Sequence, residues 1–143
     1  MSTKSRYRRV SESYMVRMLT KFLADNGYRV WHEVPNMGQS ADVVAKKGRF
    51  ITFVEAKLAD WRRALEQCRA HRHVADYICI AITGRRVSDR LIQEAEARGY
   101  GVIHFDRMDR SYRWVKRPTL NTDFWPPQRQ RLDEALKDIG YAG

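Results

Sequence analysis

The first part of the chain carries apolar residues with the spacing of a helix. They recur every three or four positions and form one stripe, made of Val10, Tyr14, Met15, Met18, Leu19, Phe22 and Leu23. A stripe of this kind is typical of a helix that lays one side against a core. We therefore predict a helix over residues 9–26, with Ser11 as its N-cap and Gly27 at its stop.

After this helix, short segments typical of strands alternate with longer amphipathic segments. Alternating or wholly apolar runs predict strands at residues 28–34, 41–46, 50–56, 76–82, 101–105 and 112–115. Helical spacing predicts further helices at residues 61–71, 87–98 and 128–139. The order αβββαβαββα predicts an α/β fold in which helices flank a central mixed sheet.

The same pattern divides the chain into three parts. Residues 1–8 are a basic lead without apolar periodicity, and we expect this lead to be flexible. Residues 9–117 form the main domain, and residues 118–143 form a C-terminal extension that carries the last amphipathic helix. The apolar side of that helix, with Leu132, Leu136 and Ile139, could cap the core or form a dimer contact.

The charge of the chain changes this picture, because the 143 residues carry a formal net charge of +10. Twenty of the 27 basic residues are arginine, whose planar guanidinium binds phosphate oxygens in pairs. Such a chain favours a polyanionic partner, although solubility alone would also account for the charge.

The sequence has no apolar run long enough for a bilayer and no leading signal segment, so we expect a soluble cytoplasmic protein with no membrane partner. Cys68 and Cys79 are expected to be reduced core residues.

Three charged residues lie where two neighbouring strands are otherwise apolar. Glu55 and Lys57 are two positions apart, so on a strand both point to one face, with Cα atoms about 7 Å apart. A two-residue turn at Gly48 and Arg49 would place Asp42 of the preceding strand opposite Glu55, with Cβ atoms about 5 Å apart. Charged side chains are costly in apolar strands, so this group suggests a site.

Two carboxylates this close repel each other unless a cation lies between them. Hard oxygen ligands suit Mg²⁺, for which Mn²⁺ can substitute, and the backbone carbonyl of Ala56 could add a third oxygen. Lys57 would then lie beside the attacking water and the scissile phosphate, where it could orient the water or neutralise charge. We therefore predict Asp42, Glu55 and Lys57 as catalytic residues for phosphodiester hydrolysis, with Mg²⁺ as cofactor.

At these residues the chain resembles the PD-(D/E)xK nuclease superfamily, which includes many restriction endonucleases and the Holliday-junction resolvases. The matching core is Asp42 with Glu55-Ala56-Lys57, and the order of elements agrees over roughly residues 8–82, with the resolvase-like branch the most similar. The resemblance implies a restriction-endonuclease-like sandwich and an Mg²⁺-dependent DNA endonuclease. It also implies 5′-phosphate and 3′-hydroxyl products and a homodimer.

The resemblance assigns two further residues. Glu12 matches a first-helix glutamate that joins the metal site in resolvase-like members, and Gln67 matches a glutamine on the helix after the ExK strand, which would make it catalytic. The sequence departs from the pattern at Ala41, where a proline often stands, and at His71, where a tyrosine often follows the glutamine by one turn. The first departure is tolerated in resolvase-like branches, and the second weakens the case for Gln67.

Plainer interpretations stay open for each residue. Asp42 could end a turn, and Glu55 with Lys57 could form a solvated ion pair. Glu12 could complement the helix dipole, and Gln67 could be an ordinary surface residue. The four histidines lack a Cys or His partner at zinc-ligand spacing, so core packing or phosphate contact is expected for them.

The basic residues have some order along the chain. We predict that DNA phosphates bind residues of the lead and of the helix after the motif, namely Arg6, Arg8, Arg9, Arg62, Arg63 and Arg69. Two other functions stay open. One is a nucleic-acid-binding module that uses the same fold without cutting, and the other is a nuclease whose target is recognised by a partner protein.

Overall fold

The computed structural model describes residues 11–36, 39–123 and 125–139 of the chain. The lead at residues 1–8 and the predicted DNA contacts Arg6, Arg8 and Arg9 lie outside the described residues. The helices are α2 (Glu12–Asp25), α3 (Trp61–Cys68), the short 3₁₀ helix η1 (Arg69–His71), α4 (Asp89–Arg98) and α5 (Pro126–Asp138). The strands are β1 (Arg29–Asn36), β2 (Gln39–Lys47), β3 (Phe50–Lys57), β4 (Tyr77–Thr83), β5 (Gly101–Asp106) and β6 (Ser111–Lys116).

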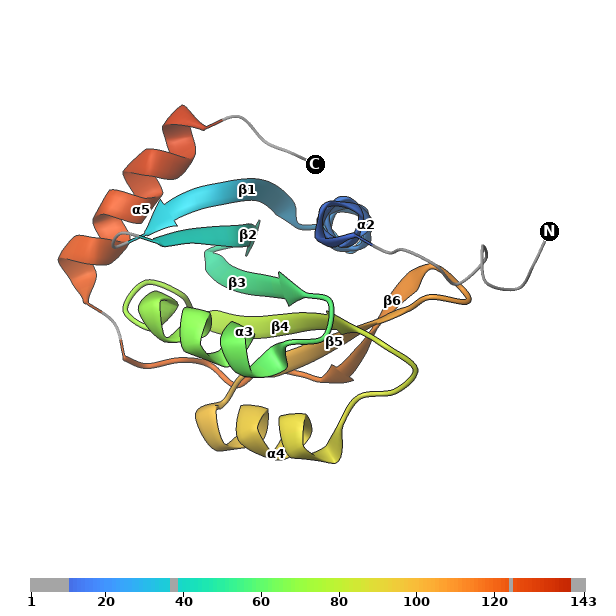
Figure 1. Ribbon diagram of the computed structural model, residues 1–143. Helices are drawn as coiled ribbons and strands as arrows, with labels where there is room; N and C mark the ends of the chain where they lie inside the picture. Colours follow the sequence, from blue (N-terminus) through green and yellow to red (C-terminus); the bar gives the residue numbers. More distant parts are fainter. Residues whose placement is uncertain (1–10, 37–38, 124, 140–143) are drawn as a thin grey trace.

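The six strands form one mixed sheet in the order β1-β2-β3-β4-β5-β6. The β1-β2-β3 meander and the β5-β6 pair are antiparallel, whereas β3, β4 and β5 run parallel. The parallel pairs need crossover connections, and α3 and α4 supply them. This confirms the predicted α/β class and order of elements, and it is consistent with a restriction-endonuclease-like sandwich (Figure 1).

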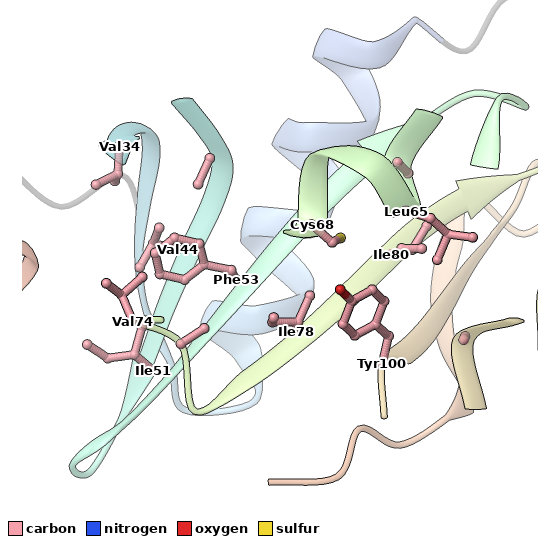
Figure 2. Close-up of a cluster of buried hydrophobic side chains, with 14 of the residues drawn as sticks. Val34, Val44, Ile51, Phe53, Leu65, Cys68, Val74, Ile78, Ile80 and Tyr100 are labelled. Atoms are coloured by element: carbon pink, nitrogen blue, oxygen red, sulfur yellow. The ribbon is translucent and has the colours of Figure 1, made fainter. Parts of the chain in front are cut away.

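Each face of the sheet is covered by helices (Figure 1). On one face, α2 buries Met15, Leu19 and Leu23 against alternate residues of β2 to β5. On the other face, α3, α4 and α5 cover a second apolar cluster, part of which Figure 2 shows around Phe53 and Ile80. The alternation along each strand therefore places successive residues in different cores.

Two element boundaries differ from the predictions at prolines. Helix α5 begins at Pro126 rather than at residue 128, because a proline in the first turn of a helix lacks only an N–H that would have no helical partner. Strand β1 runs past Pro35 to Asn36, which an edge strand tolerates because one side of its backbone is not paired.

Helix α5 packs on its own chain. Leu132 and Leu136 are buried in the same apolar cluster as Trp31 and Val34. The Arg129 guanidinium holds the helix in place, since it donates to the Asp76 carboxylate at 3.0 Å. Of the two roles considered for this apolar side, the structure shows that it caps the core.

Within the described residues, no helix is long and apolar enough to cross a membrane.

Candidate active site

The β2–β3 hairpin brings the predicted carboxylates together. Its tight turn contains Gly48 at φ +62°, a left-handed conformation that favours glycine, and its ladder runs from Lys47–Phe50 to Val43–Val54. This is the register expected from the sequence, and Asp42 and Glu55 are the next positions on the two strands. The Glu55 carboxylate raises the pKa of the Asp42 carboxyl, so the two groups lie close together on the same face of the sheet.

Asp42 is held in place by the backbone of β3. Its Oδ2 accepts a hydrogen bond from the Ala56 N–H at 2.9 Å, just past the last paired residues of the ladder. The pKa of the Asp42 carboxyl is raised to about 6. Burial is the larger cause, and the neighbouring Glu55 carboxylate is the next. Because burial and a neighbouring carboxylate both disfavour its charged form, the Asp42 carboxyl binds a proton more tightly than a free aspartate does.

Glu55 is almost completely buried, with 1% of its surface exposed. Its Oε1 lies 2.6 Å from Nε2 of His71, and its Oε2 is buried with no hydrogen-bond partner among the described residues. Burial raises the pKa of this carboxyl as well. A buried carboxylate oxygen without a donor is costly, and a bound cation would satisfy it.

His71 is a site residue that sequence reasoning missed. The sequence predicted core packing or a phosphate contact. The structure buries the ring completely against Phe53, as core packing requires, and also places it beside the Glu55 carboxylate, which the sequence did not predict. Burial lowers the pKa of His71 to about 4, so the imidazole is neutral at pH 7 and donates its Nε2 proton to Glu55. One feature of the sequence could have indicated this role. His71 lies one turn after Gln67, on the helical segment that follows the ExK strand.

Lys57 ends β3 with 15% of its side chain exposed. Its ammonium lies 3.8 Å from Oε1 of Glu12, which is half exposed in the first turn of α2. The structure thus places Glu12 beside Lys57, at the start of the helix that also carries the predicted Ser11 cap. Glu12 as a metal ligand stays a prediction.

Gln67 lies on α3, the helix that packs over β3. Its position, three residues after buried Ala64 and four before His71, places it on the same side of this helical segment as both. Its Oε1 is buried and has no hydrogen-bond partner within the described parts of the chain. Gln67 as a catalytic residue stays a prediction.

The donor set fits a hard divalent cation with few protein ligands. Asp42 and Glu55 supply adjacent carboxylates, and the Ala56 carbonyl lies between Glu55 and Lys57 in the sequence. Across the residues that the structure describes, no three His, Cys, Asp or Glu side chains gather as a metal cage. Mg²⁺ commonly binds through one or two carboxylates and keeps several waters, so the two acids suffice for it.

The predicted phosphate-binding arginines of α3 and η1 are at the surface. Arg62 and Arg63 are exposed, and the Arg62 guanidinium lies over the Trp61 ring, 4.2 Å from its centroid. Arg69 is exposed and pairs with Glu66 at 3.6 Å. These positions leave the guanidinium groups accessible, and their contact with DNA stays a prediction.

Comparisons with known proteins find similarity of fold. No protein-family model and no curated protein matches this sequence. A solved protein of unknown function from Silicibacter pomeroyi is similar over 92% of this chain and 86% of its own, with a TM-score of 0.70 and 16% identity. A FdxN element excision controlling factor protein from Anabaena variabilis is similar over 74% of this chain and all of its own, with a TM-score of 0.54 and 15% identity.

An XisH family protein from Nostoc punctiforme is a third similar structure. It covers 70% of this chain and 96% of its own, with a TM-score of 0.50 and 12% identity. At these identities the likeness concerns the fold, a mixed sheet with helices on both faces.

Proposed function

We propose that this protein is a nuclease of the PD-(D/E)xK class that hydrolyses phosphodiester bonds in DNA with Mg²⁺ or Mn²⁺. The observation that carries the proposal is the pair formed by Asp42 and Glu55. These acids lie side by side on adjoining strands, and Lys57 follows Glu55 by two residues. One buried oxygen of Glu55 has no donor among the residues that the structure describes. The name of the Anabaena protein, which ties it to excision of an element, supports a role on nucleic acid for this fold.

Each residue has a role in this mechanism. Asp42, Glu55 and the Ala56 carbonyl would hold the ion, which would polarise the phosphate and acidify a water molecule. His71 donates to one Glu55 oxygen and so leaves the other for the ion. Lys57 orients the water and neutralises charge on the phosphate oxygens. The water oxygen bonds to phosphorus, the bond to the 3′ oxygen breaks, and a proton passes to that oxygen, which leaves 5′-phosphate and 3′-hydroxyl ends.

A cleavage panel tests the proposal. Plasmid, four-way-junction and single-stranded DNA are incubated with the protein and Mg²⁺ or Mn²⁺, with EDTA as the chelator control. We expect nicking that requires the ion and is abolished in Glu55→Gln and Lys57→Ala, while DNA binding persists. Glu134→Gln and Lys137→Ala, which make the same changes at exposed positions of α5, are the matched controls.

Both active-site variants should fold. A glutamine at position 55 can still accept the His71 proton, and the half-exposed Glu12 loses little when Lys57 is removed. Unchanged cleavage by either purified variant would refute the mechanism. Preferential cutting of the four-way junction would support the resolvase-like branch, and sedimentation of the complex would show whether a dimer forms.

The second candidate is a nucleic-acid-binding module without catalysis. It is favoured by the ion pair between Lys57 and Glu12, which engages the amine that the nuclease mechanism needs. Binding to every substrate with no nicking under either ion would favour this module. A calorimetric titration with Mn²⁺ adds a second readout, because a nuclease site should bind the ion and Glu55→Gln should lose that binding.

A further inference from the structure

A pocket opens between two connections beside the candidate active site. The loop from β4 to α4 and the turn from β5 to β6 enclose about 600 Å³, and the lining residues are Gly84, Arg85, Asp106, Arg107 and Met108. This volume lies within the range of pockets that bind small ligands, which is about 300–1,000 Å³. It is large enough for one nucleotide.

The register of the sheet places this pocket at the same end of the strands as Lys57. Lys57 pairs with Ile82 of β4, and Ile82 pairs with His104 of β5. Neighbouring strands lie about 4.8 Å apart, so the Cα atoms of Lys57 and His104 are about 10 Å apart. Gly84 and Asp106 lie two residues further along these parallel strands, and both connections leave the edge where β3 ends (Figure 1).

The walls of the pocket suit a nucleotide. Arg85 is exposed and Arg107 is partly exposed, and both offer guanidinium groups for phosphate oxygens. Asp106 also lines the pocket, and its Oδ1 accepts N–H groups of the turn, from Met108 at 2.8 Å and from Asp109 at 3.3 Å. The Met108 side chain, 60% exposed, provides a polarizable apolar surface for an aromatic base.

Contacts behind the pocket hold it in place relative to the candidate active site. His104 Nε2 lies 2.9 Å from the Gly84 carbonyl oxygen, and Arg107 donates to the Thr83 hydroxyl at 3.2 Å. At the other end of the turn, the Arg110 guanidinium lies over the Tyr14 ring, 5.4 Å from its centroid. Tyr14 belongs to the first turn of α2, which also carries the partner of Lys57.

We propose that this pocket binds one nucleotide of the substrate strand, with its phosphates between Arg85 and Arg107 and its base against Met108. The inference rests on the proposed nuclease function and adds a binding subsite to it. Because the pocket and Lys57 lie at the same end of the parallel strands, one substrate strand can reach both.

Fluorescence anisotropy with the full-length protein tests the subsite. A fluorescein-labelled DNA oligonucleotide is titrated in EDTA, so that no cleavage occurs, at several salt concentrations. We expect Arg85→Ala to weaken binding on the order of tenfold and to lower the salt slope by about one. Met108→Ala should weaken binding severalfold with the slope unchanged, because an apolar contact releases no counterions.

Arg131→Ala is the matched control, since this exposed arginine lies on α5, which packs against β1 at the opposite edge of the sheet from β6. Arg85→Ala and Met108→Ala change exposed side chains, and circular dichroism would confirm that both fold. If both variants bind DNA as tightly as Arg131→Ala does while the wild type still cleaves, the subsite is refuted and the nuclease stands. A wild type that binds but never cleaves refutes the nuclease alone, and one that binds no DNA refutes both.

Discussion

Replacing Asp42 by asparagine should stabilise the metal-free protein at neutral pH. The folded state raises the pKa of the Asp42 carboxyl from 3.8 to about 6, so ionising this group above that pH costs folding free energy. Asparagine resembles the protonated acid, because its oxygen can accept the Ala56 N–H and its amide can donate to Glu55.

The magnitude follows from the pKa. A rise of about two units corresponds to about 3 kcal/mol, and solvent screening of the partly exposed carboxyl reduces this to about 2 kcal/mol. The native state binds the proton more tightly, so the contribution of Asp42 to stability is present below about pH 4 and is lost as pH rises through about 6. His71 acts in the opposite direction, because its lowered pKa costs stability as pH falls from about 6.5 to about 4.

Urea unfolding in EDTA between pH 4 and pH 7.5 measures the effect. Because His71 titrates in the same window, the informative quantity is the free energy of unfolding of Asp42→Asn minus that of the wild type. We expect about zero at pH 4 and about 2 kcal/mol in favour of the variant at pH 7.5. Asp25→Asn, at an exposed acid on α2, is the control.

The outcome has a clear refutation. A variant that is less stable than the wild type at pH 7.5, or a stability difference that does not change with pH, would show that the folded state does not raise the pKa of Asp42. Added Mg²⁺ should reduce the difference in free energy of unfolding between Asp42→Asn and the wild type, since an ion that binds only the folded wild type stabilises it by mass action.

Two further predictions concern buried polar contacts. His71→Ala removes the donor to Glu55 and leaves a cavity beside Phe53. We therefore expect the free energy of unfolding in urea to fall by about 2–4 kcal/mol, and by less for His71→Gln. Equal stability of His71→Ala and the wild type would contradict the buried contact. Asp76→Ala leaves the Ile51 N–H and the Arg129 guanidinium without their shared acceptor and should cost about 3–5 kcal/mol, measured by thermal unfolding. A change below about 1 kcal/mol would show that this link does not hold α5.

Local pattern was sufficient for the elements and for the central pair of acids. Helix and strand periodicities reflect which residues face a core, so the order αβββαβαββα follows from the sequence and is confirmed. The turn at Gly48 sets the hairpin register within a few residues, so Asp42 and Glu55 could be aligned without knowledge of the rest of the fold.

Contacts between distant elements were decided only by the tertiary structure. The pairing of His71 with Glu55 depends on how α3 and η1 pack over β3, and the pairing of Lys57 with Glu12 depends on where α2 begins against the sheet. A periodic pattern shows which side of a helix is buried, but it does not show which side chain of another element that helix will meet. Those meetings follow from the simultaneous packing of all the elements.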